Sequence, residues 1–422
     1  MQLKIDKNSF WLIILIFLSY SNIELFSYFA GDGFIGKLNY YGPILSYVLI
    51  ILYCMSQPRK SGEKVLNCGF KLNIVPYIAA ILYTVIIFLL NGNGMDYLSR
   101  LVSSALYYML AVGAMYEMLQ LMGCRVLDYY IDVTIFTYLL SAFTGTIISR
   151  GRGLSLYVRE TFLGHYVGTN PYKGFFEVHE LIFIMGLFII FLLFFKKQKN
   201  KKDYRRLIWC ILCFIFGFKR IGLAGIVVVV LLLLIINKPL KGIAAPLIRI
   251  ETICAIVICF IFVYMILDDS FIALLLQKGI ADNGRSIIYS HFRTICNFSV
   301  GYLGKGYTFV SRYIEGLGSS VLNNMASIRG LHSGVFEKYV ELGFIGSLLW
   351  HWWFLYHISS TYIKKFGKEM ALCYLMLTSY SYITYLTDNT HGYRNFQIVL
   401  LMIPIAYFMQ INKGKNGVLI DD

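Results

Sequence analysis

Charged residues are scarce in this chain of 422 residues, because Asp, Glu, Lys and Arg together make up only 14%. Soluble domains average about a quarter charged residues. With so few charges and 58% hydrophobic residues, the composition excludes a cytosolic enzyme, a nucleic-acid-binding protein and a disordered scaffold. Long apolar runs also lack any polar face, as in 227–236, which reads VVVVLLLLII. The sequence therefore predicts an all-α, polytopic integral membrane protein.

The cysteine residues are not arranged as a disulfide framework or a metal site. The nine Cys residues give no even disulfide framework. Cys210 and Cys213 lie inside an apolar run, where buried core positions are more frequent than a metal or redox pair. The net charge of +15 fits the Lys and Arg residues that membrane proteins collect in cytoplasmic loops. These features predict no metal, no cofactor and no nucleic-acid partner.

Twelve apolar segments predict membrane-crossing helices, which need about 20 mainly apolar residues each. The first run follows Lys4 and Lys7 and has no small-residue cleavage site behind it, so it is interpreted as a span and not as a signal peptide. Two connections are long, 149–175 and 268–341, and the others are short. The predicted spans are 9–30, 38–57, 73–91, 98–120, 127–148, 176–195, 205–218, 221–237, 247–267, 342–361, 369–387 and 395–411.

The pair Lys219 and Arg220 decides the topology in the middle of the chain. A single helix over 206–236 would extend roughly 45 Å across an apolar bilayer core of about 30 Å, with two adjacent cations at its centre. Two short helices that meet at this pair avoid both problems. With both termini inside, 22 Lys and Arg residues then lie on cytoplasmic segments and five on short external ones, as the positive-inside rule requires. We expect this pair below the outer membrane surface, where a cation serves function or extends to the headgroups.

The predicted spans divide the chain into three parts. Residues 1–267 hold spans one to nine, 268–341 form a large external loop, and 342–422 hold the last three spans and a cytoplasmic tail. In the loop, FIALLL at 271–276 predicts a helix lying on the bilayer surface. A Gly- and Tyr-rich stretch, GYLGKGYTFV, follows. Gly343 and Gly346 at the start of the tenth span predict close helix packing.

Three short motifs occur in a particular order. Arg220 opens an apolar helix, 284–289 reads G-R-x-x-x-Y, and 332–346 reads H-x(10)-G-x-x-G. In this order the motifs resemble the O-antigen ligase and polymerase family, in which an Arg begins a span, a second Arg follows a Gly in the large periplasmic loop, and a His precedes a helix with paired glycines. The motifs cover 215–350, and the span count and loop position extend the resemblance to most of the chain. The family often has Ser before the first Arg, where this chain has Lys219.

The resemblance implies a glycosyltransferase of the GT-C type in the bacterial inner membrane, with its site on the periplasmic side. Its donor would be an undecaprenyl-pyrophosphate-linked oligosaccharide. Arg220 and Arg285 would stabilise the pyrophosphate leaving group, because a guanidinium binds phosphate oxygens in bidentate fashion. His332 would act as general base on the acceptor hydroxyl. No Asp-x-Asp or His cluster with metal-ligand spacing lies on the external segments, so the reaction is expected to need no metal.

Further basic and aromatic residues on the external side are candidates for substrate binding. Arg152 lies in the basic first loop, for which attraction to anionic membrane lipid is the stronger interpretation. Asp388, His391 and Arg394 lie in a short external turn and are candidates for lining the same cavity. The substrate-binding candidates are Lys219, Tyr289, Arg293, Arg312 and Arg152.

Three functions remain open at this point. A polysaccharide polymerase would transfer the growing glycan to the non-reducing end of a lipid-linked repeat, with a chain-length-regulating co-polymerase as a possible partner. A ligase would use the same Arg and His residues with lipid A-core or protein as acceptor. The abundance of Tyr, Phe, Ile and Lys favours the polymerase, since it is typical of AT-rich surface-polysaccharide clusters. A flippase for lipid-linked sugars is less well supported, because the polar residues concentrate in one loop and no internal repeat is found.

Overall fold

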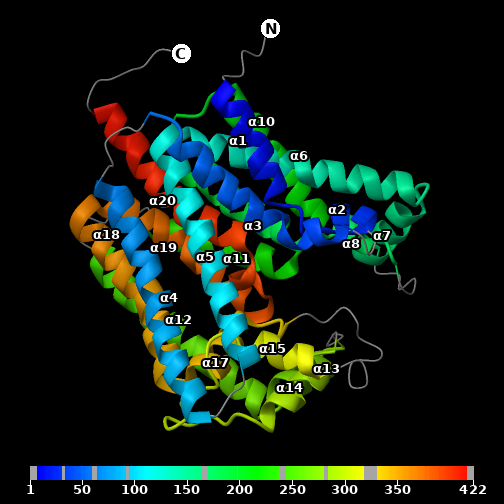
Figure 1. Ribbon diagram of the computed structural model, residues 1–422, viewed down its shortest axis with the longest axis vertical. Coiled ribbons are helices and arrows are strands. Elements are labelled where there is room, and N and C mark those ends of the chain that lie inside the picture. Colours follow the sequence, from blue (N-terminus) through cyan, green and yellow to red (C-terminus); the bar gives the residue numbers. More distant parts are fainter. Residues whose placement is uncertain are drawn as a thin grey trace. The chain divides into compact units, whose positions relative to one another are not determined.

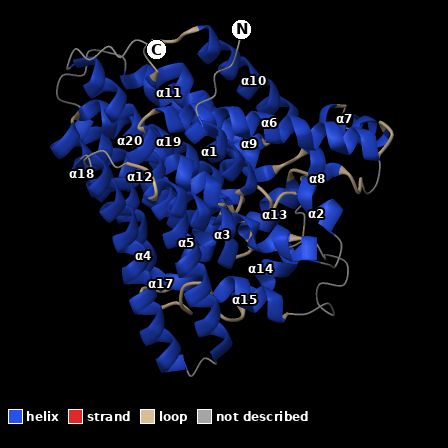
Figure 2. Ribbon diagram, turned by 45° about the horizontal axis from the view of Figure 1, so that its top comes forward, coloured by secondary structure: helices blue, strands red, loops and turns tan. Residues whose placement is uncertain are grey.

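The computed structural model consists of helices joined by loops (Figure 1). It describes residues 7–30, 34–58, 64–91, 95–163, 170–196, 198–236, 244–279, 284–317 and 330–415. Within these ranges most residues are helical and no strand occurs, as Figure 2 shows. The predicted all-α fold is therefore confirmed.

Six helices are long and apolar enough to cross a membrane. Shorter apolar helices cover Ser9–Leu18, Tyr41–Met55 and Arg220–Leu234. These helices are those of an α-helical membrane protein, while the count of twelve spans stays a prediction. The six long segments are Lys64–Asn91, Asp96–Met122, Arg125–Ile148, Lys173–Phe195, Ala245–Leu267 and Arg394–Asn412.

The helices pack into two compact units. Unit 1 contains 1–69, 110–229 and 393–422, and unit 2 contains 70–109 and 230–392. Three helices pass from one unit into the other along the chain: α4 (Lys64–Asn91), α5 (Met95–Met122) and α11 (Arg220–Ile236). The other elements of unit 1 are α1 (Lys7–Leu18), α2 (Glu24–Ala30), α3 (Phe34–Met55), α6 (Arg125–Ile148), α7 (Arg152–Phe162), α8 (Lys173–Phe176), α9 (His179–Ile190), the π-helix η1 (Phe191–Phe195), α10 (Lys201–Gly217) and α20 (Arg394–Lys415).

The single first span predicted over 9–30 is wrong, because α1 ends at Leu18 and a separate α2 begins at Glu24. Side chains in the connecting turn bind groups far away in the sequence. The Ser19 hydroxyl donates to Oδ1 of Asn395 at 3.0 Å, and the Tyr20 hydroxyl lies 2.9 Å from that of Thr134. These contacts stabilise a turn at a point where the apolar composition favours a continuous helix.

The predicted break between the seventh and eighth spans is confirmed. Helix α10 begins with a capping box between Asn200 and Asp203 and ends at Gly217. Phe218 then adopts a left-handed conformation with φ 44°, which stops the helix, and α11 begins at Arg220. Cys210 and Cys213 are buried in α10 with free thiols, as expected of core positions.

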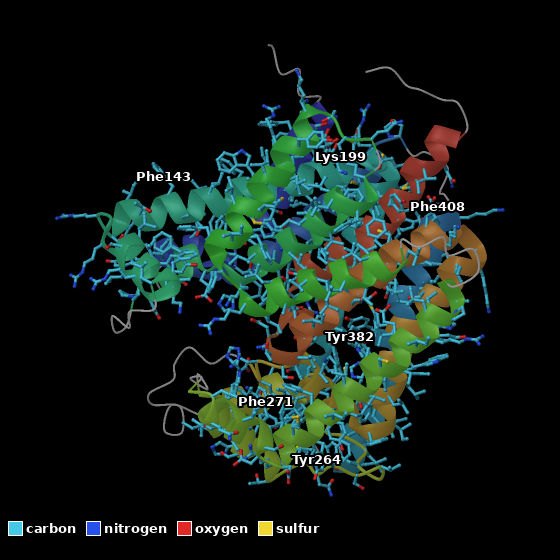
Figure 3. The ribbon with its side chains drawn as sticks, turned by 180° about the vertical axis from the view of Figure 1, so that it is seen from behind. Phe143, Lys199, Tyr264, Phe271, Tyr382 and Phe408 are labelled. Carbon is cyan, nitrogen blue, oxygen red and sulfur yellow. The ribbon has the colours of Figure 1, made fainter. Side chains whose placement is uncertain are left out.

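Unit 2 holds the predicted external loop and the helices on either side of it. Phe271 and Tyr382 are two members of its apolar core (Figure 3). The helix predicted at 271–276 is confirmed as α13, and its place on the bilayer surface stays a prediction. The elements are α12 (Ala244–Leu267), α13 (Ser270–Gln277), α14 (Arg285–Arg293), α15 (Phe309–Gly316), α17 (Gly334–Trp352), the π-helix η2 (Trp353–His357), α18 (Ile358–Phe366), α19 (Lys368–Thr387) and the 3-10 helix η3 (Thr390–Gly392).

The helix predicted as the tenth span begins earlier and is interrupted. Within α17, Gly343 has φ 71° and ψ −173°. The Gly- and Tyr-rich stretch packs its backbone against this point, where a Cβ on either Gly304 or Gly343 would overlap the opposite main chain. The amide of Phe344 donates to the Tyr302 carbonyl at 2.9 Å. The close packing expected at Gly343 is therefore to a loop and not to a helix.

Candidate functional site

Arg285 occupies the first position of α14 in unit 2. Gly284 before it has φ 78°, a left-handed conformation that glycine adopts without steric cost. The Arg285 Nη2 donates to the carbonyl oxygen of Thr387 at 3.1 Å. Its Nε is buried and has no hydrogen-bond partner among the described residues. The Gly-Arg pair thus directs a partly satisfied guanidinium toward the end of α19.

Tyr289 lies one helical turn after Arg285 and therefore on the same face of α14. It is fully buried, with its ring 5.5 Å from that of Phe336 in an edge-to-face arrangement. Burial raises the pKa of Tyr289, against an opposing effect of Arg285. The hydroxyl finds no hydrogen-bond partner within the described part of the chain. Tyr289 anchors α14 in the core and leaves one polar atom without a bond.

His332 lies in the short loop before α17. It is half-buried and has φ 51°, which is uncommon for a residue with a side chain. The next residue, Ser333, caps α17 by accepting a hydrogen bond from the Phe336 amide at 3.1 Å. The Gly334 amide donates to the Asp388 carbonyl at 3.2 Å. The helix cap and this bond fix the loop that carries His332.

The turn after α19 packs against this loop. A Cβ at Gly330 would overlap the Asn389 amide, and a Cβ at Gly334 would overlap the imidazole of His391. The two glycines thus allow the turn to lie directly on the loop. Asn389 Oδ1 and His391 Nδ1 are buried and, among the residues with described positions, neither has a hydrogen-bond partner.

The structure therefore brings three segments together within unit 2: the start of α14, the loop 330–334 and the turn 387–391. Arg285 contacts the turn, and the turn contacts the loop of His332. Asp282 and Asn283, which precede this Gly-Arg motif, lie outside the described residues. Four buried polar atoms without a partner among the described residues lie on α14 and on this turn: Arg285 Nε, Tyr289 Oη, Asn389 Oδ1 and His391 Nδ1.

Arg293 and Arg312 have carboxylate partners that hold helices of unit 2 in place. Arg293 forms an ion pair with Asp269 and donates from Nε to the Ile266 carbonyl at 2.8 Å. Arg312 forms an ion pair with Asp96 at 2.9 Å, and this hydrogen bond raises the pKa of Arg312. These contacts give both residues a structural role, and their part in substrate binding stays a prediction.

Lys219, Arg220 and Arg152 belong to unit 1. The ammonium of Lys219 lies 2.5 Å from Oε1 of Glu177 and 2.9 Å from Nε2 of His179. Arg220 and Arg152 are exposed at the first positions of α11 and α7. The predicted meeting of Arg220 with Arg285 and His332 joins two units that are described separately, so it remains a prediction.

Sequence reasoning named Lys219, His391 and Gly330 but missed the residues that they contact. Glu177 for Lys219, Glu337 for His391 and Asn389 for Gly330 carry no local motif. For Glu177 the available signal is an acidic residue at the start of the predicted span 176–195, where a carboxylate needs a partner.

In the described part of the chain, no three His, Cys, Asp or Glu side chains are grouped as metal ligands would be. No family model, curated protein or solved structure matches this chain. The family resemblance consequently rests on the ordered sequence motifs alone.

Proposed function

We propose that this protein is a surface-polysaccharide polymerase of the O-antigen and capsule type. It is a GT-C-like, metal-independent glycosyltransferase of the bacterial inner membrane that acts on the periplasmic side. The donor is an undecaprenyl-pyrophosphate-linked glycan, and the acceptor is the non-reducing end of a lipid-linked repeat unit. In this proposal the six long helices and further apolar segments of the chain together make about twelve spans.

The observation that carries the proposal is the convergence of Arg285, the His332 loop and the turn 387–391 in unit 2. The Arg285 Nη2 reaches the Thr387 carbonyl at 3.1 Å, and the Asp388 carbonyl binds Gly334, two residues after His332. The Arg285 guanidinium and the loop that carries His332 are thus attached to one turn, although 47 positions separate the two residues in the sequence. Both groups are needed when a hydroxyl displaces a pyrophosphate.

The residues of this chain have distinct tasks in the proposed reaction. The acceptor hydroxyl oxygen bonds to the anomeric carbon while the bond from that carbon to the pyrophosphate oxygen breaks. The hydroxyl proton passes to the imidazole of His332, since imidazole is the side chain that most often serves as a general base. Arg285, and Arg220 from unit 1, stabilise the charge that develops on the leaving pyrophosphate.

The deciding experiment is deletion of the gene in its host followed by gel analysis of surface glycan. A polymerase mutant accumulates a single repeat on the anchor. Free lipid-linked polymer would identify a ligase instead, and loss of every external product would identify a flippase.

The proposed topology has its own test. Reporter fusions at Lys201 and Lys365 should read cytoplasmic, and a fusion at Ser320, which lies outside the described residues, should read external. A cytoplasmic signal at Ser320 would overturn the external site and the catalytic roles with it.

A further inference from the structure

Glu337 and His391 connect the first turn of α17 to the turn after α19. The Nε2 of His391 lies 2.9 Å from Oε1 of Glu337, and the two side chains are 12% and 18% exposed. An ionised carboxylate only accepts hydrogen bonds, so the proton of this contact belongs to Nε2. Lys338 places its ammonium 3.7 Å from the same carboxylate oxygen. The Nε2 edge of the His391 imidazole is thus held by the Glu337 carboxylate of α17.

The other edge of this imidazole is fixed by shape. It lies against Gly334, where any Cβ would overlap Nδ1. The ring of Tyr385 meets it edge to face at 6.0 Å. Together with the bond from the Gly334 amide to the Asp388 carbonyl, these contacts define where the turn 387–391 lies relative to α17.

The position of this turn matters to Arg285. Thr387 is the last residue of α19 and leads directly into the turn, and its carbonyl accepts from Arg285 Nη2 at 3.1 Å. Displacement of the turn would move that acceptor. The guanidinium would then lose the contact that sets its orientation at the start of α14.

We infer that His391 is a positioning residue: held by Glu337 and seated on Gly334, it fixes the turn whose Thr387 carbonyl orients Arg285. It acts through Arg285 and touches no reacting atom. The inference rests on the proposed function for its activity readout. It adds a second histidine with a role distinct from that of His332.

Replacement by the two amides separates this role from proton transfer. In Gln, the amide nitrogen is as many bonds from Cα as Nε2 of His, so His391→Gln keeps a donor to Glu337. In Asn, the amide nitrogen ends at the level of Nδ1, so His391→Asn loses it. We expect polymer formation within about threefold of wild type for Gln, and a loss of about tenfold to a hundredfold for Asn and Ala, the value of a hydrogen bond to a charged group.

The route through Arg285 is tested by a double variant. If His391 acts by orienting Arg285, adding His391→Ala to Arg285→Ala should cause no further loss of activity. His291→Ala, which changes a histidine in the last turn of the same helix α14, is the matched control and should leave activity unchanged. Full activity of His391→Ala, equal activity of the Asn and Gln variants, or additive losses in the double variant would each overturn the inference.

Hydrogen exchange over a peptide covering 385–395 gives a readout that needs no substrate. His391→Ala should raise exchange in the turn, and His391→Gln should keep it close to wild type. Unchanged exchange in the Ala variant overturns the positioning role even where the glycan assay supports a polymerase. Raised exchange with no transfer by wild type would reject the proposed function and keep the positioning role.

Discussion

Two polar clusters, one in each unit, differ in how completely their hydrogen bonds are formed. In unit 1, Oδ1 of the buried Asn395 accepts from the hydroxyls of Ser19 and Tyr47, both at 3.0 Å, and its Nδ2 donates to the Ser19 carbonyl at 3.1 Å. Its backbone amide donates to Glu180 at 2.9 Å, so a carboxylate lies at the N-terminus of α20, where it is favoured. In unit 2, the cluster at Arg285, Asn389 and His391 leaves polar atoms without partners among the described residues.

The difference separates folding from function. A fully bonded buried network fixes the structure around it, whereas a buried polar atom without a partner costs free energy unless something else binds it. The Asn395 network joins the turn after α1 to α3, α9 and α20, and the side-chain oxygen and nitrogen of Asn395 are both bonded. The Arg285 cluster has unused hydrogen-bonding capacity next to His332. Variants in the first cluster should therefore reduce the amount of folded protein, and variants in the second should reduce activity.

The largest loss of activity is expected at His332. A positioned general base contributes about a hundredfold to ten-thousandfold, so His332→Ala should abolish polymer while the protein remains folded in the membrane. Gln and Asn cannot take up a proton at neutral pH and should fail as Ala does. In a purified lipid-linked assay, wild-type activity should fall on the acid side as the imidazole protonates, and it should survive EDTA. An active His332→Gln enzyme with the wild-type pH profile would end the assignment as base.

Arg285 should follow, with a loss of about a hundredfold to a thousandfold for Arg285→Ala, the usual effect of removing a donor that stabilises developing charge. Arg285→Lys keeps the charge but not the planar fork, so it should retain only a small part of the activity. The assay is polymer formed at equal expression. Wild-type polymer from the Ala variant would remove Arg285 from the site.

The sequence alone was sufficient for the features that have local causes. Apolar composition predicted the all-α fold, and the cations Lys219 and Arg220 predicted the break before α11. The turn at Ser19 was missed because it depends on Asn395, which is 376 positions away. The pairing of Glu337 with His391 was missed for the same reason, since no local pattern encodes which turn α17 will meet.

Asn395→Ala should sharpen the comparison from the side of unit 1. It removes the oxygen that accepts from the Ser19 and Tyr47 hydroxyls and the nitrogen that donates to the Ser19 carbonyl, while Ser19 Oγ keeps its 2.7 Å bond to the Ile16 carbonyl. The loss of these buried hydrogen bonds should cost about 1–3 kcal/mol. We expect a lower melting temperature and a lower yield of monodisperse protein in detergent. Activity per folded molecule should stay close to wild type. A variant that folds normally but loses activity would show that the Asn395 cluster serves function and not folding alone.

The smallest effect on activity is expected at Arg312. This residue lies in unit 2, but its guanidinium has carboxylate partners, unlike the Nε of Arg285. Its side chain is 37% exposed, and its guanidinium pairs with Asp96 at 2.9 Å and with Glu315 at 3.6 Å. Exposed ion pairs of this kind contribute about 0–1 kcal/mol, so Arg312→Ala should shift the melting temperature by a few degrees at most. Since its contacts are made within the protein, polymer formation should remain within about threefold of wild type, measured beside Arg285→Ala at equal expression. A loss as large as that of Arg285→Ala would mean that an arginine with formed ion pairs can still bind substrate. In that case, whether an arginine of unit 2 has its hydrogen bonds formed would no longer distinguish a structural role from a functional one.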